Sequence, residues 1–164
     1  MASKIILNEY IIASDKPQKT AIREAFEARL AQITTAGGYW CDVTVYDFKK
    51  RNYNDDDIQY PYVHVTPADI DLKSAAPDSL QMQNSLTIVG VIKIAEEDDY
   101  LTQLEKLEED VLRCLFPKKT GMQPGAFNTL NCELTNIYYD ARESGDSEAS
   151  INFTISYNTT IQTK

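Results

Sequence analysis

The chain has 164 residues and a formal net charge of -9, because 25 acidic side chains outnumber 16 basic ones. Its length is typical of one domain with its own core, and its charge argues against a protein that binds DNA or RNA. Three cysteines without a C-x-x-C motif indicate reduced thiols. The apolar run near the N-terminus is too short for a signal peptide or a membrane span. We therefore expect one soluble, intracellular domain over residues 1–164, with residues 1–18 as an N-terminal extension. Residues 5–13 fit either a strand or an extra helical turn.

The first predicted element is a helix that follows Pro17, a residue suited to a first helical turn. Ser14 or Asp15 is the expected cap. Apolar side chains then recur at helical spacing, at Ile22, Ala25, Phe26, Leu30 and Ile33. The pair Gly37-Gly38 is expected to end the helix, because glycine accepts the left-handed conformation common at helix ends.

Three strands are predicted next from apolar residues at every second position. They cover residues 39–46, 60–66 and 83–95. Two prolines flank the second, which favours a short strand at the sheet edge, and the third is apolar on both faces and therefore central. Residues 68–80 show no period, so we expect a long loop there.

A second helix is predicted after Asp98 or Asp99 as its cap, ending before Pro117. Its apolar stripe consists of Tyr100, Leu101, Leu104, Leu107, Val111, Leu112 and Leu115. Two strands follow, over residues 132–139 and 149–161. The order α-β-β-β-α-β-β predicts an α+β fold, with a mostly antiparallel sheet of about five strands and two helices packed on one face.

The residues offer no recognisable catalytic constellation. The lone histidine, His64, lacks a G-x-S-x-G partner, so we interpret it as a surface or interface residue. No phosphate-binding glycine motif occurs, and neither the cysteines nor the acidic clusters have the spacing of a zinc or calcium site. We therefore expect no enzyme, no catalytic residue, no cofactor and no metal. A small-molecule-binding module or an enzyme that uses unrecognised carboxylates is the less favoured alternative.

Ten tyrosines exceed what one small core easily buries with every hydroxyl satisfied, and tyrosine is enriched at protein interfaces. Several of them flank the second strand, beside polar segments that we expect to order on contact with a partner. The candidate interface residues are Tyr53, Tyr60, Tyr62, Asp55, Asp56, Asp57, Asp69 and Asp71.

The order of the predicted elements and the amino-acid sequences within them resemble a known family. TAIREAFEARLAQI of residues 20–33 runs straight into TTAGGYWCDV of residues 34–43. The strand YPYVHVTP of residues 60–67 comes next, and LTIVGVIKI of residues 86–94 leads into the second helix. Over residues 19–161 this pattern resembles the tail terminator, or tail completion, proteins of tailed bacteriophages, the group that includes the lambda tail terminator.

The resemblance implies a ring, usually of six copies, that caps the tail tube, ends its polymerisation and joins the tail to the head connector. Implied partners are the tail tube protein, the sheath if the tail contracts, and a head-completion protein. DNA would pass through the ring without specific binding, and no membrane is involved. The implied location is the virion, after assembly in the host bacterial cytoplasm. Another neck protein, such as a connector stopper, is the nearest alternative.

Overall fold

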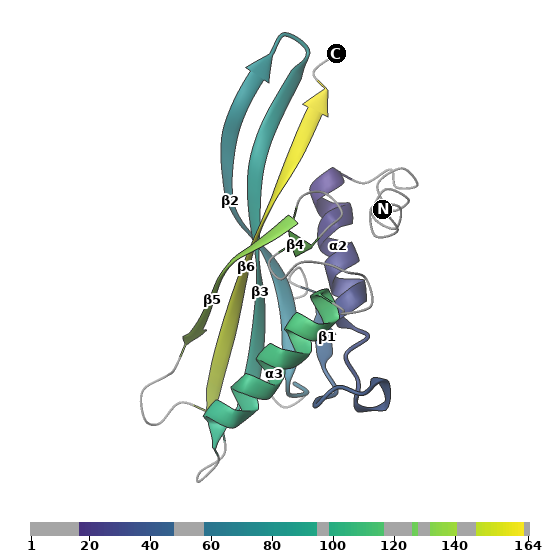
Figure 1. The fold of residues 1–164 in the computed structure, drawn as a ribbon, viewed down its shortest axis with the longest axis vertical. Helices are drawn as coiled ribbons and strands as arrows, with labels where there is room; N and C mark the ends of the chain where they lie inside the picture. Colours follow the sequence, from purple (N-terminus) through teal and green to yellow (C-terminus); the bar gives the residue numbers. More distant parts are fainter. Residues whose placement is uncertain are drawn as a thin grey trace.

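The computed structural model describes residues 17–47, 58–94, 99–116, 126–127, 132–140 and 147–162 (Figure 1). Its elements are α2 (Gln18–Leu30), the 3-10 helix η1 (Thr35–Gly37), β1 (Thr44–Tyr46), β2 (Tyr62–Ala76), β3 (Ser79–Lys93), α3 (Tyr100–Leu115), β4 (Ala126–Phe127), β5 (Cys132–Asp140) and β6 (Glu148–Gln162). The strands form one sheet in the order β1-β2-β3-β6-β5-β4. Only the pair β1–β2 is parallel among the described strands.

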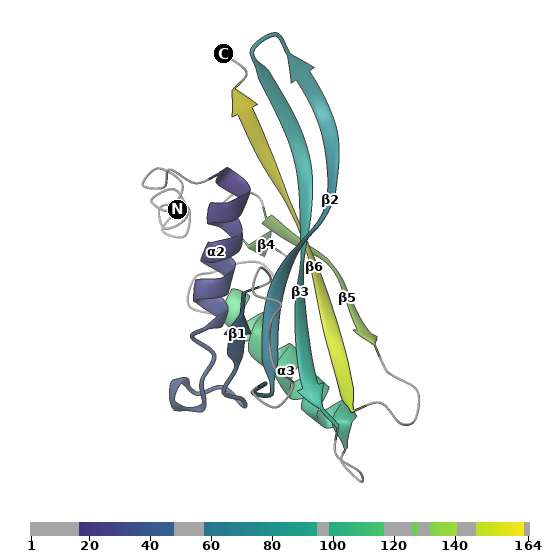
Figure 2. The same ribbon diagram turned by 180° about the vertical axis from the view of Figure 1, so that it is seen from behind.

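Both helices lie on one face of this twisted sheet (Figures 1 and 2). Helix α2 contacts β2, and α3 crosses β3 and β6. The predicted α+β class, its element order and its helices on one face are therefore confirmed, and the two-residue strand β4 is an addition to the prediction.

Helix α2 buries the predicted apolar stripe but ends earlier than expected. The fully buried residues of the stripe are Ile22, Phe26, Leu30 and, just beyond the helix, Ile33. The glycine pair does not end α2. Gly38, with a φ of 89°, instead ends η1, and Thr34 begins η1 because its hydroxyl accepts a hydrogen bond from the Gly37 amide.

The two helices begin differently. Pro17 precedes α2 and offers no capping side chain, and the predicted caps Ser14 and Asp15 lie outside the described residues. Asp99 caps α3 as predicted, since its carboxylate accepts bonds from the Thr102 hydroxyl at 2.6 Å and the Thr102 amide at 3.1 Å. These two bonds hold the pKa of Asp99 below its ordinary value.

The helices are joined by a reciprocal pair of hydrogen bonds. Arg29 Nε donates to the Cys114 carbonyl at 2.9 Å, and Cys114 Sγ donates to the Arg29 carbonyl at 3.2 Å. Four leucine and valine side chains of the α3 stripe are fully buried, namely Leu104, Leu107, Val111 and Leu115. Leu101 was predicted to join them but is 47% exposed, because it lies in the first turn, near one end of the molecule (Figure 1). The predicted stop at Pro117 and the segment 5–13 lie outside the described residues.

The largest error of the sequence prediction concerns residues 68–80. They are not a loop: they form the second half of β2 and the start of β3, joined by a turn at residues 77–78. The pairing of β2 with β3 shifts register between Pro67 and Ile70 and again between Leu72 and Ser74. These irregularities break the period of two in the sequence, and they accommodate a proline inside a strand.

Strands β3 and β6 are the centre of the sheet, a place that the sequence predicted for β3. Alternation in the sequence places the apolar residues of β6 on one face of the strand. This face is buried from Ala149 to Tyr157, but Ile161 is 46% exposed. Ile161 pairs with Leu80, where the sheet has passed beyond the helices. Alternation identifies a face of a strand and not what covers that face.

Gly90 allows α3 to approach β3 closely. A Cβ at this position would lie 2.8 Å from Leu107 Cδ2 and 3.2 Å from Ile151 Cγ2, and both residues are fully buried. We expect Gly90→Ala to lower the free energy of unfolding by about 1–3 kcal/mol through overpacking. Urea denaturation measures this, with Gln81→Ala on the exposed part of β3 as the control. An unchanged midpoint for Gly90→Ala would show that α3 moves away without cost.

Candidate interaction surfaces

The predicted interface residues do not form one patch. Tyr53, Asp55, Asp56 and Asp57 lie outside the described residues. Tyr62 begins β2 and Tyr60 lies two residues before it, whereas Asp69 and Asp71 lie farther along the strand. At about 3.3 Å per residue, Tyr62 and Asp69 are roughly 20 Å apart. The structure therefore separates the tyrosines from these two aspartates.

The tyrosines belong to an aromatic cluster where β1 meets β2. The ring centroids of Tyr62 lie 5.2 Å from Tyr46, 5.5 Å from Tyr60 and 6.2 Å from His64. Parallel pairing of the strands places Tyr46 opposite His64. The Tyr60 hydroxyl donates to a carboxylate oxygen of Glu148 on β6. His64 is thus a half-buried member of an aromatic group.

The upper part of the sheet forms a three-stranded arm that extends beyond both helices (Figure 1). It consists of residues 67–76 of β2, 79–86 of β3 and 157–162 of β6. We call one side of it the arm face, defined by Ile70, Leu72, Leu80, Met82 and Ile161. Register pairs Leu72 with Met82 and Leu80 with Ile161, on the side of β3 that buries Leu86 and Ile88 lower down.

The arm face is apolar and uncovered within the described structure. Ile70 is 57% exposed and Leu72 is 62% exposed. Large exposed apolar side chains that gather on one face are typical of contact surfaces in soluble proteins. The arm face is therefore the strongest candidate interaction surface, and sequence reasoning missed it because residues 68–80 were predicted to be a loop.

A small pocket of about 130 Å³ lies where the arm face meets the first turns of α2, with Lys19 and Arg23 among its lining residues. Asn84, only 2% exposed, also lines it. Asn84 Nδ2 donates to Thr159 Oγ1 at 2.8 Å, but Asn84 Oδ1 is buried without a hydrogen-bond partner. Such an acceptor is costly to leave unsatisfied.

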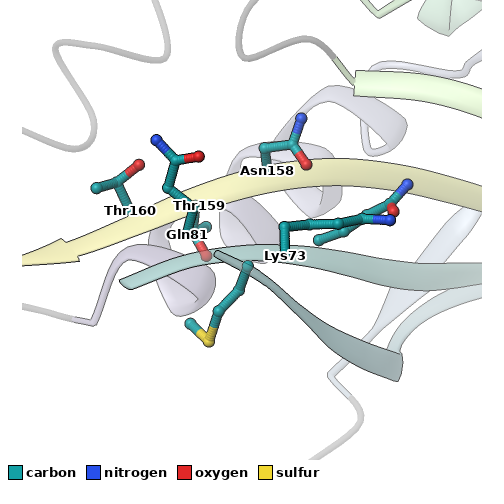
Figure 3. Close-up of a pocket in the computed structure, with 7 residues that line it drawn as sticks. Lys73, Gln81, Asn158, Thr159 and Thr160 are labelled. Atoms are coloured by element: carbon teal, nitrogen blue, oxygen red, sulfur yellow. The ribbon is translucent and has the colours of Figure 1, made fainter. Parts of the chain in front are cut away.

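The opposite side of the arm carries a polar groove of about 500 Å³ (Figure 3). Its lining includes Lys73, Gln81, Asn158 and Thr160, whose side chains stand on three neighbouring strands. Gln81 already accepts a bond from the Ser74 hydroxyl at 3.1 Å. The groove is open, polar and internally bonded, which is typical of a solvated sheet face.

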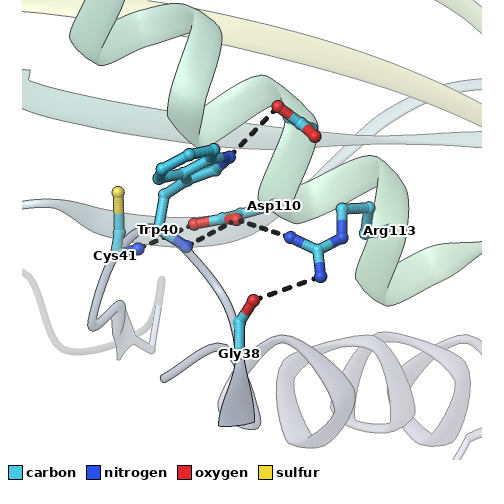
Figure 4. Close-up of polar contacts among 6 residues, drawn as sticks. Gly38, Trp40, Cys41, Asp110 and Arg113 are labelled. Carbon is cyan, nitrogen blue, oxygen red and sulfur yellow. Dashed lines mark hydrogen bonds and ion pairs between the residues drawn. The ribbon is translucent and has the colours of Figure 1, made fainter. Parts of the chain in front are cut away.

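A buried carboxylate fixes the segment between η1 and β1 (Figure 4). Asp110 of α3 is fully buried and accepts hydrogen bonds from the amides of Trp40 at 3.0 Å and Cys41 at 2.9 Å. Arg113 lies 3.9 Å from the same carboxylate and donates to the Gly38 carbonyl at 3.1 Å. Because these amides bond to a side chain, β1 begins only at Thr44, and the predicted strand over residues 39–46 is too long.

Asp110 has a structural role, because its carboxylate already accepts hydrogen bonds from two backbone amides and lies beside the Arg113 guanidinium. Around it, Trp40 Nε1 donates to Glu109 at 3.1 Å and Lys106 lies 5.6 Å from the Trp40 ring. Sequence reasoning missed Asp110, although the signal was present: it is an acidic residue between Leu107 and Val111 of the apolar stripe.

A second surface, which we call the α3–β5 patch, consists of Leu101, Glu105, Glu108 and Tyr139. The three α3 residues share one helix face by their spacing of four and three. The Tyr139 hydroxyl donates to the Glu108 carboxylate. Burial, that bond and the charges of Glu108 and Glu105 raise the pKa of Tyr139 to about 12. The patch is thus partly apolar and negatively charged.

The three cysteines are free thiols. Burial raises the pKa of Cys132 to about 12, and burial together with the Asp110 charge raises that of Cys41 to about 11. Burial also raises the pKa of Cys114. Reactive cysteines need a lowered pKa, so none of these three raised values indicates a reactive thiol.

The raised thiol pKa values predict alkaline destabilisation. Cys132 has a folded pKa of about 12 against an ordinary value of 9.0, so its contribution is fully present below pH 9 and is lost as pH rises from 9 toward 12. We expect the free energy of unfolding to fall over this window, and Cys132→Ala to reduce the slope. Urea titrations at several pH values measure both. A stability that rises above pH 9, or an unchanged slope in the variant, contradicts this assignment.

Within the described residues, no cluster of three or more possible metal ligands occurs. None of the helices in the described part of the chain is both long and apolar enough to cross a membrane. Neither observation adds a site to the two surfaces defined above.

Comparisons with known proteins leave the family open. No family model and no curated protein matches the chain. One solved structure is 21% identical and aligns over 84% of this chain and 92% of its own length, with a TM-score of 0.48.

Proposed function

We propose that the protein is a structural component of a bacteriophage virion, an oligomeric ring that caps the tail tube, ends its polymerisation and joins the tail to the head connector. It acts by shape and assembly and performs no catalysis. The order of the elements and the amino-acid sequence of residues 19–161 support this function through their resemblance to tail terminators.

The observation that carries the proposal is the arm face. In a monomer, the sheet extends past its own helices and leaves Ile70 and Leu72 exposed to water. Exposure of such apolar side chains is unfavourable. Subunits of an assembly bury such surfaces against one another, and that burial supplies the main driving force of association. The arm is therefore best explained as a part that is completed by a neighbouring molecule.

The charge of the chain fits passage of DNA through such a ring. At a net charge of -9, the averaged field around each subunit repels phosphates and lets DNA slide without specific binding. Expected partners are the tail tube protein, the sheath of a contractile tail and a head-completion protein. No cofactor and no membrane enters this scheme.

The experiment is deletion of the gene from the phage genome that carries it, with electron microscopy of the lysate. We expect tail tubes of abnormal length and unjoined heads, both restored by the wild-type gene in trans. Tubes of normal length with unjoined heads would instead identify a connector stopper. Normal virions from the deletion mutant would contradict the proposed function.

A further inference from the structure

The two exposed apolar surfaces lie at opposite ends of the molecule. The arm occupies one end of the long axis, and the start of α3 and the end of β5 lie toward the other (Figure 1). Leu101 belongs to the first turn of α3, and Tyr139 is the penultimate residue of β5. A contact that joins the two surfaces therefore brings the arm of one copy to the far end of the next. Made reciprocally by two antiparallel copies, this contact gives a closed dimer, and made once between successive copies it gives a head-to-tail series.

Charge also distinguishes the two surfaces. The base of the arm face presents Lys19 and Arg23 at its pocket. Glu27 lies 3.5 Å from Arg23 and offsets that charge, so Lys19 is the cation best placed to meet a carboxylate from a neighbour. The α3–β5 patch presents Glu105 and Glu108 beside its apolar residues.

A two-fold contact through either surface alone is less favourable. If two α3–β5 patches met, Glu105 and Glu108 would face their own copies, and like charges brought together in an interface repel. If two arm faces met, the Lys19 side chains at their pockets would be brought toward each other, and like charges repel. Contact between unlike surfaces instead pairs the carboxylates of Glu105 and Glu108 with Lys19.

We propose that the arm face of one copy packs on the α3–β5 patch of the next, so that the protein assembles through one repeated head-to-tail contact. This rests on the proposed function, because it supplies the contact between subunits of the ring. Contacts between two different surfaces generate closed rings when the rotation closes, whereas a two-fold contact stops at a dimer.

The test uses one variant on each surface, Leu72→Asp on the arm face and Leu101→Asp on the α3–β5 patch. Both side chains are more than 45% exposed, so the subunits should fold. Burying an unpaired carboxylate at the contact is expected to raise the dissociation constant at least ~30-fold. Sedimentation velocity, at a concentration where the wild type is oligomeric, should show monomers for each variant alone.

Mixing the two variants gives the decisive result. Each retains the surface that the other has lost, so one intact contact forms and the expected species is a 1:1 dimer that grows no further. Thr160→Asp, on the opposite side of the arm, is the matched control and should assemble like the wild type. Ile161→Asp and Glu105→Lys are second variants of the two surfaces, should either first variant fail to fold.

The outcomes separate the inference from the proposed function. If either variant alone keeps the wild-type mass, or if the mixture stays monomeric, the head-to-tail contact is wrong while a ring built by other surfaces stands. If the wild type is monomeric at every concentration, both the contact and the ring are overturned.

Discussion

Phe153→Ala is expected to lower the free energy of unfolding by about 3–5 kcal/mol, the range found when a buried aromatic side chain is truncated. Phe153 is fully buried on β6, the strand between β3 and β5, where it pairs with Ile88 and Ile137. Domains of this size have a total stability of about 5–15 kcal/mol, so the loss is a large fraction. Urea denaturation with a shared slope measures it.

Thr154 is the control for this prediction, because it is the next residue of β6 and points to the side without helices. It is half-buried, and its hydroxyl is not part of the core. Thr154→Ala should change the stability by less than about 1 kcal/mol. A Phe153→Ala variant as stable as Thr154→Ala would mean that the two layers do not pack as described.

Asp110→Ala is expected to lower the free energy of unfolding by about 3 kcal/mol, since it removes a buried acceptor and leaves the amides of Trp40 and Cys41 without a partner. Asp110→Asn keeps one acceptor oxygen and should cost less. Because Trp40 is the single tryptophan of the chain, its fluorescence reports the release of this segment directly.

Glu109→Ala provides the matched control for the Asp110 prediction. It removes only the exposed bond to the Trp40 indole, so we expect less than about 1 kcal/mol. Equal losses for Glu109→Ala and Asp110→Ala would show that the buried carboxylate does not fix the segment before β1.

The elements with an unbroken period were predictable from the sequence, because burial of one face imposes that period. The stripes of α2 and α3 and the alternation of β6 follow this rule, and Asp99 as a cap follows from its position before the stripe of α3. The arm was not predictable, because register shifts beside Pro67 and Leu72 interrupt the alternation.

The candidate surfaces were harder to predict than the fold. Tyrosine content directed attention to the beginning of β2, where the ring centroids of Tyr60 and Tyr62 lie 5.5 Å apart. Their role at an interface stays a prediction. The exposure of Leu72 and Leu101, however, depends on where the helices stop covering the sheet. That is a property of the packed layers, and neither the period nor the composition of one segment contains it.

Subunits that meet through two unlike surfaces and close into a ring have one fixed mass. Native mass spectrometry of the wild-type protein over a range of micromolar concentrations measures that mass. We expect one closed oligomer, of six copies if the resemblance to tail terminators holds, whose mass does not change with concentration. A monomer throughout, a dimer as the end state, or a ladder of sizes that lengthens with concentration would contradict it.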